Sequence, residues 1–210
     1  MVLFDLCGES EQHPAYQALE VANGARQYDF IRSLVLASLA VDRPFLSTHI
    51  IKALNFQAIT CLHTNAGEYR PCPVTVGDYV PPPHYRLDAL MEDFVNFVNR
   101  TWETSDPVLL AAFVLWRLNY IHPFINGNGR TARAACYFVL CVKLNGLLPG
   151  TTILPELLRQ NRDAYVMALQ QVDASARTGT ADLSPLANLL GLLLAQQINV
   201  AMPAGPAPAA

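Results

Sequence analysis

The feature that most constrains this chain is a pair of strongly apolar segments of helix length with a polar stretch at their junction. The first segment runs from Pro107 to about Ile121, and the second runs from Asn128 to about Leu144. Segments that are apolar on nearly all sides predict helices buried in a common core. The junction, residues 122–133, reads HPFINGNGRTAR. Polar residues and glycines at the centre of a helical core indicate a functional loop.

Helical patterns continue along most of the remaining chain. Ser105-Asp106-Pro107 supply a cap and a first-turn proline for the first apolar helix, and Asn145-Gly146 should end the second. Further helices are predicted over residues 16–40 with an interruption at Asn23-Gly24, from Ser47 or Thr48 to about 63, and over 87–104, 155–176 and 184–201. The predicted fold class is therefore mainly α.

One segment departs from the helical pattern. Residues 68–83 are rich in proline, valine and tyrosine. Val74 and Val76 alternate with Thr75, and Gly77-Asp78 is a turn signal. We expect a short β-hairpin or an extended flap here.

Length and composition exclude several classes of protein. The 210 residues predict one domain, and 15% charged residues with a net charge of −3 give no electrostatic basis for general nucleic-acid binding. The longest apolar tracts, 134–142 and 189–195, are too short to cross a membrane, and the N-terminus lacks a secretory pattern. Five cysteines without a CxxC pair predict buried, reduced thiols, so we expect a cytoplasmic protein or one delivered into a host cytosol.

The polar junction has the composition of an anion-binding loop. Gly127 and Gly129 let the backbone approach a ligand closely, and the free N–H groups at the start of the following helix attract an anion. Arg130 and Arg133 lie three residues apart on one helix face, from which both can reach a polyphosphate. The segment therefore predicts a phosphate or nucleotide site.

A histidine at the start of this loop is suited to proton transfer. Pro123 disfavours helical geometry at His122, so the first apolar helix should end there and place the imidazole at the mouth of the site. The residues alone leave open that the histidine is a satisfied polar group and that the glycines only make a turn. A P-loop NTPase is excluded because no GxxxxGK[ST] is present, and a metal hydrolase is disfavoured because the five histidines are isolated.

The junction resembles the signature of the Fic (Fido) domain family, HPFx[D/E]GNGRxxR, and departs from it only at the fifth position. Residues 67–70, leading into 74–77, resemble the family's flap. Asn161-Arg162, followed by Tyr165 and Leu169, resembles the helix after the family's core. The resemblance covers most of residues 45–195. We therefore expect one Fic domain over residues 1–200, with a helical extension at 1–44 and a flexible Pro/Ala-rich tail at 201–210.

The resemblance implies transfer of AMP from ATP to a Ser, Thr or Tyr hydroxyl of a target protein. His122 would be the general base, and Phe124 would anchor the loop. Val74, Thr75, Val76 and Gly77 would bind the target segment by strand-like pairing. The family's pattern assigns nucleotide and phosphate binding to Asn126, Gly127, Asn128, Gly129, Arg130, Thr131, Arg133 and Tyr165, with Val166 beside the adenine. Asp173 stands where the family has asparagine, so a nucleotide contact there is not expected.

The departure from the signature concerns the metal. Where the family has Asp or Glu to hold Mg²⁺, this chain has Asn126. Mg²⁺ prefers charged oxygen ligands, so Mg²⁺ or Mn²⁺ would be held weakly by this amide. The sequence leaves open an active transferase, a transferase of a different nucleotide, or a silenced nucleotide binder that acts as an adaptor.

Two further comparisons with the family concern activity and control. Kinase-type relatives carry lysine in place of the second motif glycine, and Gly129 favours nucleotidyl transfer instead. The family's inhibitory helix, [S/T]xxxE[G/N], has only a loose counterpart at Thr64-xxx-Glu68, in the flap region. Inhibition then either comes from a separate antitoxin-like protein or is lacking, and we expect the former. A homo-oligomer stays open.

Overall fold

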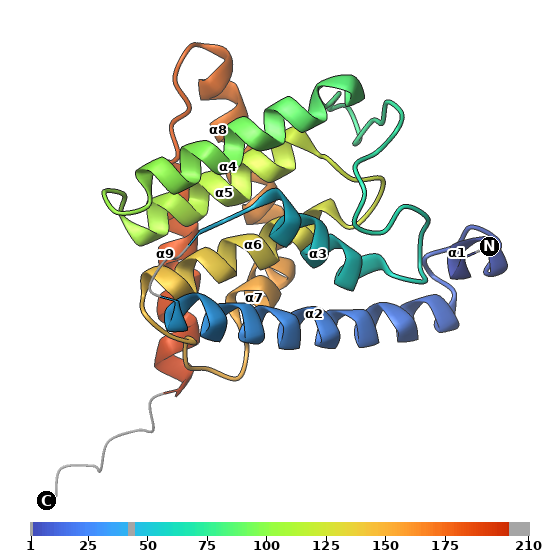
Figure 1. The fold of residues 1–210 in the computed structure, drawn as a ribbon, viewed down its shortest axis with the longest axis horizontal. Helices are drawn as coiled ribbons and strands as arrows, with labels where there is room; N and C mark the ends of the chain where they lie inside the picture. Colours follow the sequence, from blue (N-terminus) through green and yellow to red (C-terminus); the bar gives the residue numbers. More distant parts are fainter. Residues whose placement is uncertain (1, 42–44, 202–210) are drawn as a thin grey trace, which may run out of the picture.

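The computed structural model describes residues 2–41 and 45–201, and their fold is mainly α, as the sequence predicts (Figure 1). The helices are α1 (Leu3–Leu6), α2 (Pro14–Ala40), α3 (Thr48–Ile59), the 3₁₀ turn η1 (His84–Arg86), α4 (Leu87–Thr101), α5 (Pro107–Ile121), α6 (Asn128–Lys143), α7 (Leu154–Gln160), α8 (Arg162–Arg177) and α9 (Ser184–Ala201).

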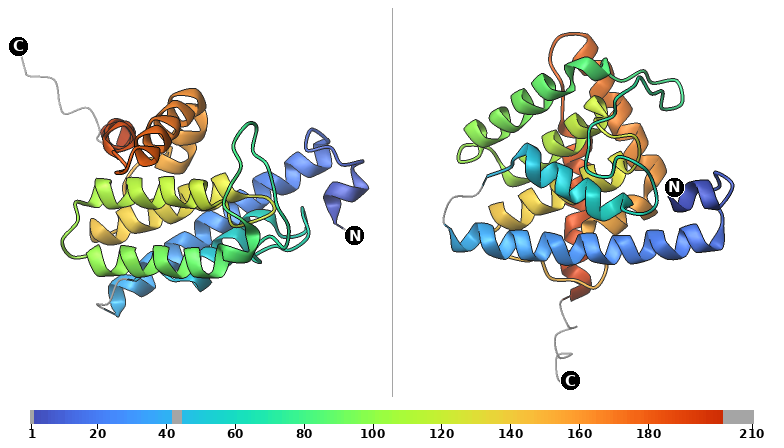
Figure 2. Two further views of the ribbon diagram at one scale, coloured as in Figure 1. Left: turned by 90° about the horizontal axis from the view of Figure 1, so that it is seen from above. Right: turned by 45° about the vertical axis from the view of Figure 1, so that its right-hand side comes forward.

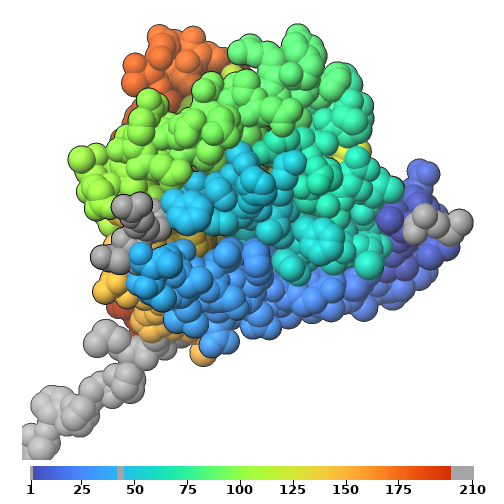
Figure 3. All heavy atoms as spheres, in the orientation of Figure 1, coloured from blue at the N-terminus to red at the C-terminus, as the bar shows by residue number. Residues whose placement is uncertain are grey.

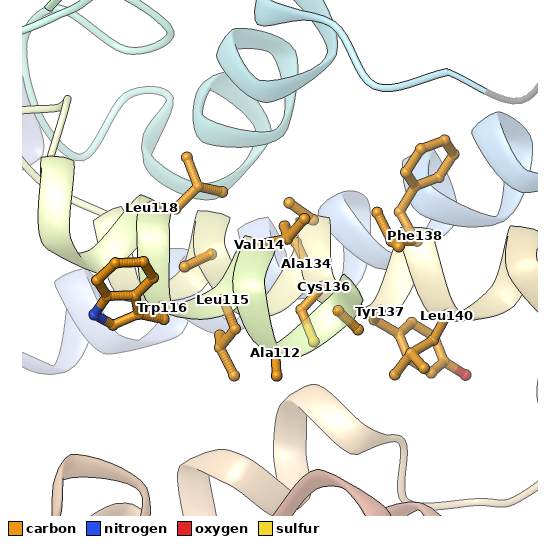
Figure 4. Close-up of a cluster of buried hydrophobic side chains, with 14 of the residues drawn as sticks. Ala112, Val114, Leu115, Trp116, Leu118, Ala134, Cys136, Tyr137, Phe138 and Leu140 are labelled. Atoms are coloured by element: carbon orange, nitrogen blue, oxygen red, sulfur yellow. The ribbon is translucent and has the colours of Figure 1, made fainter. Parts of the chain in front are cut away.

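Helices α5 and α6 form the centre of the core. Every residue from Ala134 to Val142 of α6 is buried, which matches a helix that is apolar on all sides. Buried side chains of α5 and α6 belong to one hydrophobic cluster, part of which Figure 4 draws, among them Leu115, Trp116 and Phe138. The remaining helices surround this pair, so the loop between α5 and α6 is anchored at both ends in the core.

Helices on opposite sides enclose the central pair. Helices α2 and α3 contact α6 on one side, and together with α4 they form the face seen in Figure 3. Helices α8 and α9 pack against α5 on the other side, as the left view of Figure 2 shows. The described part of the predicted N-terminal extension is thus largely helical, and its helix α2 covers the core. None of the described residues belongs to a helix that is both long and apolar enough to span a bilayer.

The predicted caps of the central helices are confirmed. The Asp106 carboxylate accepts hydrogen bonds from the backbone N–H groups of Val108 and Leu109, each at 2.9 Å, and Pro107 occupies the first turn. At the end of α6, Asn145 adopts a left-handed conformation with φ +60°, and Gly146 N–H donates to the carbonyl of Cys141 at 2.9 Å.

Several helix boundaries differ from the sequence prediction. Helix α2 continues through Asn23-Gly24 because the buried Asn23 side chain donates to the carbonyls of Ala58 and Thr60, at 3.3 and 3.0 Å. Helix α3 ends at Ile59, four residues early, and Cys61 just beyond it takes φ +63°. The predicted helix over 155–176 divides at Asn161 into α7 and α8. Tertiary contacts decide these boundaries, and local pattern does not reveal them.

The predicted β-hairpin is not confirmed. Within residues 68–83 the chain forms no strand, only isolated bridges of Tyr69 to Phe124 and of Val76 to Tyr79. The turn at Gly77-Asp78 does form, with two hydrogen bonds of 2.9 and 3.0 Å between Val76 and Tyr79. Five prolines in the segment lack the N–H groups that a longer ladder needs, so it stays an extended flap.

The expectation of buried thiols is wrong for part of the cysteines. Cys136 and Cys141 are buried in α6, but Cys61 and Cys72 are exposed because they lie in loops, and Cys7 is half-buried. All five are free thiols. The predicted tail at 201–210 lies outside the described residues, apart from the backbone of Ala201 at the end of α9.

Candidate functional site

The loop between α5 and α6 begins with a residue in an unusual backbone conformation. His122 ends α5 with φ +51° and ψ +58°, and its N–H donates to the carbonyl of Leu118 at 3.0 Å. A left-handed conformation is uncommon for a residue other than glycine, so the surrounding contacts must hold it. The helix therefore ends at His122, as the following proline predicts.

Two reciprocal hydrogen bonds fix the shape of this loop. The Asn128 side chain accepts from Phe124 N–H at 2.9 Å and donates to the Phe124 carbonyl at 2.8 Å. The ring of Phe124 is fully buried, with its centroid 5.7 Å from that of Tyr69. Phe124 is thus the anchor that the resemblance implies. The Asn128 side chain is committed to this anchor, so only the backbone N–H of Asn128 can serve an anion hole.

A buried asparagine on α3, which the sequence pattern does not identify, holds the other end of the loop. The Asn55 amide donates to the Asn126 carbonyl at 2.9 Å and to the Thr131 hydroxyl at 3.2 Å, and its oxygen accepts from Gly67 N–H at 3.0 Å. Thr131 in turn donates to the Gly127 carbonyl at 2.9 Å and is buried. Thr131 supports the loop rather than lining the phosphate surface, contrary to our expectation.

Arg70 of the flap is a buried cation that binds backbone. Its guanidinium donates to the carbonyls of His122 at 2.8 Å, Cys72 at 3.0 Å and Pro82. Its backbone N–H also donates to the Pro123 carbonyl at 2.8 Å. Burial lowers the pKa of this guanidinium. The three carbonyls replace the lost water, and through them Arg70 ties the flap to the start of the loop.

The loop ends in a backbone nest at the start of α6. The first backbone hydrogen bond of this helix runs from Thr131 N–H to the Gly127 carbonyl at 2.9 Å. The N–H groups of Asn128, Gly129 and Arg130 precede it, so they point out of the helix end without a helical partner. Gly127 reaches φ +75°, which turns the chain into this helix. These donors and the positive end of the helix dipole suit an anion.

Arg133 faces this nest without a counter-ion. The side chain is half-buried, and among the described residues it makes no hydrogen bond or ion pair. Burial lowers its pKa, because the charged form loses water, and neighbouring Arg130 and Arg159 act in the same direction. A half-buried guanidinium without a partner is costly, so this arrangement favours an anionic ligand.

Two cavities meet at the nest. One of about 780 Å³ lies between α2 and the start of α6 and is lined in part by Glu20, Asn126 and Arg130. The other, of about 470 Å³, lies between α5 and α8 and is lined in part by Tyr165 and Val166. The lining residues shared by both cavities are His122, Gly129, Arg133 and Arg159. An elongated ligand can therefore occupy both cavities, with its charged part at the nest.

Residues that the sequence assigned to a base pocket line the smaller cavity. The Tyr165 hydroxyl is held by the Asn119 amide at 2.8 Å. Asp173 also lines this cavity, but one of its carboxylate oxygens is engaged by the Trp116 indole N–H at 2.8 Å. Val76 of the flap lies at the same cavity, whereas Val74, Thr75 and Gly77 do not line it. Of the four predicted flap residues, the structure thus brings one to the site.

The environment of His122 keeps its imidazole neutral. Burial lowers its pKa to about 4, and the positive charge of Arg70 acts in the same direction, against a hydrogen bond with the backbone of Asn119 that favours the protonated form. Protonation of this ring would place a second cation in a partly desolvated site. At neutral pH the ring therefore has a free nitrogen lone pair that can accept a proton.

Acidic residues of the N-terminal segment contact the motif, which the sequence pattern does not anticipate. Glu20 of α2 forms an ion pair with Arg130 at 3.2 Å, and Arg130 also donates to the Ala58 carbonyl at 3.0 Å. Glu11 accepts from the Asn126 amide at 3.1 Å. Neither glutamate belongs to a local motif, so only proximity in the fold identifies them.

The expected metal ligand is already occupied by other groups. The Asn126 side-chain oxygen accepts from the Arg130 guanidinium at 3.0 Å. A divalent cation on that oxygen would stand beside a positive charge and would have no carboxylate from the loop. Within residues 2–41 and 45–201, no three His, Cys, Asp or Glu side chains lie close enough to hold a metal ion. The motif loop therefore does not fit Mg²⁺, because it lacks the carboxylate that usually holds this ion beside the phosphates.

Comparison with known proteins finds one family over the central part of the chain. Residues 45–140 match the model of the Fic/DOC family. A protein adenylyltransferase Fic from Nematostella vectensis is 36% identical over 110 residues, which are 51% of this chain and 24% of that protein. Its namesake from Drosophila willistoni is 46% identical over 68 residues, 32% of this chain and 14% of that protein. The chain therefore spans about a quarter or less of the length of these relatives.

Solved structures agree on the fold. A Fic domain containing signaling protein from Bacteroides thetaiotaomicron superposes with a TM-score of 0.68 at 22% identity, over 87% of this chain and 72% of that chain. Fic-1 from C. elegans gives a TM-score of 0.67 at 24% identity, over 86% of this chain and 49% of that chain. The described residues therefore have the fold of Fic-domain structures, and residues 45–140 match the Fic/DOC family itself.

Gly127 offers a direct test of the loop geometry. A Cβ at this position would lie 2.5 Å from Ile59 Cγ2 and 3.1 Å from the Asn55 amide, at φ +75°. We expect Gly127→Ala to destabilise the protein by about 1–3 kcal/mol in urea unfolding, because of overpacking and backbone strain.

Gly24 is the matched control. It lies inside α2, and no atom lies within 4 Å of the position that a Cβ would take there. Gly24→Ala should stabilise the protein by roughly 0.5–1 kcal/mol. Equal effects of the two substitutions would contradict the loop geometry described above.

Proposed function

We infer that this chain is a protein adenylyltransferase that moves AMP from ATP to a Ser, Thr or Tyr hydroxyl of a target protein. The observation that carries the inference is the uncompensated Arg133 guanidinium beside a helix N-terminus, between two cavities. The names of the relatives, protein adenylyltransferase Fic, support the reaction type.

The proposed binding mode follows the two cavities. The triphosphate would lie on the N–H groups of Asn128, Gly129 and Arg130, with the Arg130 and Arg133 side chains on its charges. The base and ribose would occupy the smaller cavity beside Tyr165, since that cavity has an aromatic and aliphatic lining. Val76 at the rim of this cavity would lie close to the incoming target segment.

The proposed chemistry needs one proton acceptor. The oxygen of the target hydroxyl attacks the α-phosphorus of ATP, and the bond from that phosphorus to the β-phosphate oxygen breaks. Pyrophosphate leaves with the electron pair, and the His122 imidazole accepts the hydroxyl proton. The lowered pKa of His122 and its position in the lining of both cavities support this proposed role. The guanidinium groups and backbone donors would stabilise the charge on the phosphates.

A second candidate is a nucleotide binder without transfer activity, which would act as an adaptor. Two observations favour it: Asn126 stands where the family's signature has a carboxylate, and Glu20 already neutralises Arg130. The two candidates differ in one measurable outcome, the formation of a covalent AMP adduct.

The first experiment is intact-mass spectrometry of the purified chain and a candidate target after incubation with ATP. We expect a mass increase of one AMP group for the wild type and none for His122→Ala, because the proton acceptor is lost. His49→Ala, an exposed histidine on α3, is the control and should behave as the wild type. Nucleotide binding without an adduct in any protein would favour the adaptor, and absence of both would contradict the proposed site.

The low pKa of His122 predicts an unusual pH profile. Because the folded pKa is about 4, the imidazole stays neutral from pH 8 down to 5.5, so kcat/KM should be flat over this range. A histidine with the ordinary pKa of about 6.5 would lose activity about tenfold at pH 5.5. Steady-state rates at constant ionic strength measure this, and a decline with a midpoint near 6.5 would count against the buried base.

The Glu20–Arg130 pair predicts internal inhibition. Phosphate binding to Arg130 must displace this carboxylate or leave it beside the phosphates, and either costs affinity. We therefore expect Glu20→Ala to tighten ATP binding by about threefold to tenfold in calorimetry. Glu103→Ala, an exposed site remote from both cavities, is the control. An unchanged dissociation constant for Glu20→Ala would leave a separate antitoxin-like partner as the proposed source of inhibition.

A further inference from the structure

Both ends of the Asn126 side-chain amide are engaged, each by a group of fixed polarity. The amide nitrogen donates to the Glu11 carboxylate at 3.1 Å, and the amide oxygen accepts from the Arg130 guanidinium at 3.0 Å. A carboxylate only accepts and a guanidinium only donates, so the orientation of the amide is determined by its partners. Asparagine is the short side chain that satisfies both.

A carboxylate at the same position would satisfy only one of them. Aspartate would still accept from Arg130, but it would place a second negative charge about 3 Å from Glu11. The N-terminal segment brings Glu11 to this point from 115 residues away, and Tyr16 and His63 lie against the same carboxylate, with the Tyr16 hydroxyl 2.8 Å from His63 Nε2. The fold of this chain thus brings Glu11 beside the position where the family's signature has an acidic residue, and Asn126 can donate a hydrogen bond to Glu11 where an acid could not.

The positive charge around the nest comes from arginines. Arg130 and Arg133 line the larger cavity together with Arg159, and Arg162 lines the smaller one. The three glutamates nearest the motif are already engaged: Glu11 by Asn126, Glu20 by Arg130 and Glu156 by Arg159 at 2.6 Å. Arg133 and Arg162 therefore have no carboxylate partner among the described residues. With the helix N-terminus, and with Arg130 once a phosphate displaces Glu20, they can balance part of the charge of a nucleoside triphosphate.

We propose that Asn126 is a positioning residue, which aims the Arg130 guanidinium at the phosphates, and that this site binds a nucleoside triphosphate without a divalent cation. The proposal rests on the proposed function for the identity of the ligand. In this proposal Arg130, Arg133 and the α6 N-terminus provide the positive charge that a metal ion would otherwise provide.

The direct test is calorimetric titration of the full chain with ATP, once in EDTA and once in MgCl₂. We expect dissociation constants that agree within about threefold. Binding at least tenfold tighter with Mg²⁺ would overturn the proposal and leave the proposed function standing. Absence of ATP binding in both buffers would contradict the proposed function and, with it, the proposal of metal-free binding.

A substitution of Asn126 sharpens this test. Asn126→Asp restores the signature's carboxylate, so we expect ATP affinity in EDTA to fall at least tenfold and to recover when MgCl₂ is added. Asn188→Asp makes the same chemical change at an exposed position of α9 that lines neither cavity, and it should leave both dissociation constants unchanged. Equal ATP affinity of Asn126→Asp and the wild type in EDTA would overturn the positioning role.

A third measurement tests the Asn126 contact without any nucleotide. Glu11→Gln should raise the melting temperature of the Asn126→Asp protein by about 1–3 °C, because the new amide can donate to the new carboxylate. The same substitution should not raise the melting temperature of the wild type, in which it replaces the charged acceptor of the Asn126 amide by a neutral and weaker one. An equal shift of the melting temperature in both backgrounds would show that the two positions are uncoupled, and it would overturn the role of Asn126.

Discussion

The site depends on the two hydrogen bonds between the Asn128 side chain and the backbone of Phe124. They close the loop between the two most buried helices, and the polar groups that they satisfy could find no water in this core. Asn55 on α3 and Arg70 in the flap act in a similar way. Each is a buried polar side chain that donates a hydrogen bond to a backbone carbonyl of the motif. The loop is thus held by contacts from three separate parts of the chain. Its backbone N–H groups at the start of α6 remain free to bind a ligand.

Electrostatics gives this rigid loop its chemical character. Arg133 is half-buried without a partner among the described residues, which costs folding free energy unless an anion binds. Burial disfavours the charged form of Arg133, and it also lowers the pKa of His122. The same partly desolvated region between the two cavities therefore favours both an anionic ligand and a neutral imidazole. Of the two motif arginines, Arg130 is the one that forms an ion pair with an acidic residue of the N-terminal segment, Glu20. The extension before residue 45 therefore takes part in the site, although the family match begins at residue 45.

Much of the architecture could be predicted from local patterns. The caps at Asp106 and Asn145, the end of α5 at His122 and the turn at Gly77-Asp78 follow from backbone preferences of single residues, and each was found. Predictions failed where a distant partner intervened. Helix α2 continues past Gly24 because the buried Asn23 side chain is hydrogen-bonded to the carbonyl of Ala58. Thr131 is hydrogen-bonded to Asn55 and does not line either of the two cavities. The flap lacks strands because five prolines interrupt any ladder, and it binds the motif mainly through Arg70.

The amino-acid pattern predicts the mainly helical class and the place of the motif between two buried helices. It also shows a histidine, two glycines and two arginines within twelve residues. These properties follow from periodicity and spacing, which are local. The groups that complete the site are determined by contacts between distant parts of the chain. Asn55 lies 71 residues from the loop carbonyl that it binds, and Glu11 lies 115 residues from Asn126. Such pairs leave no local signature, because their positions are set by how α2 and α3 pack on the core.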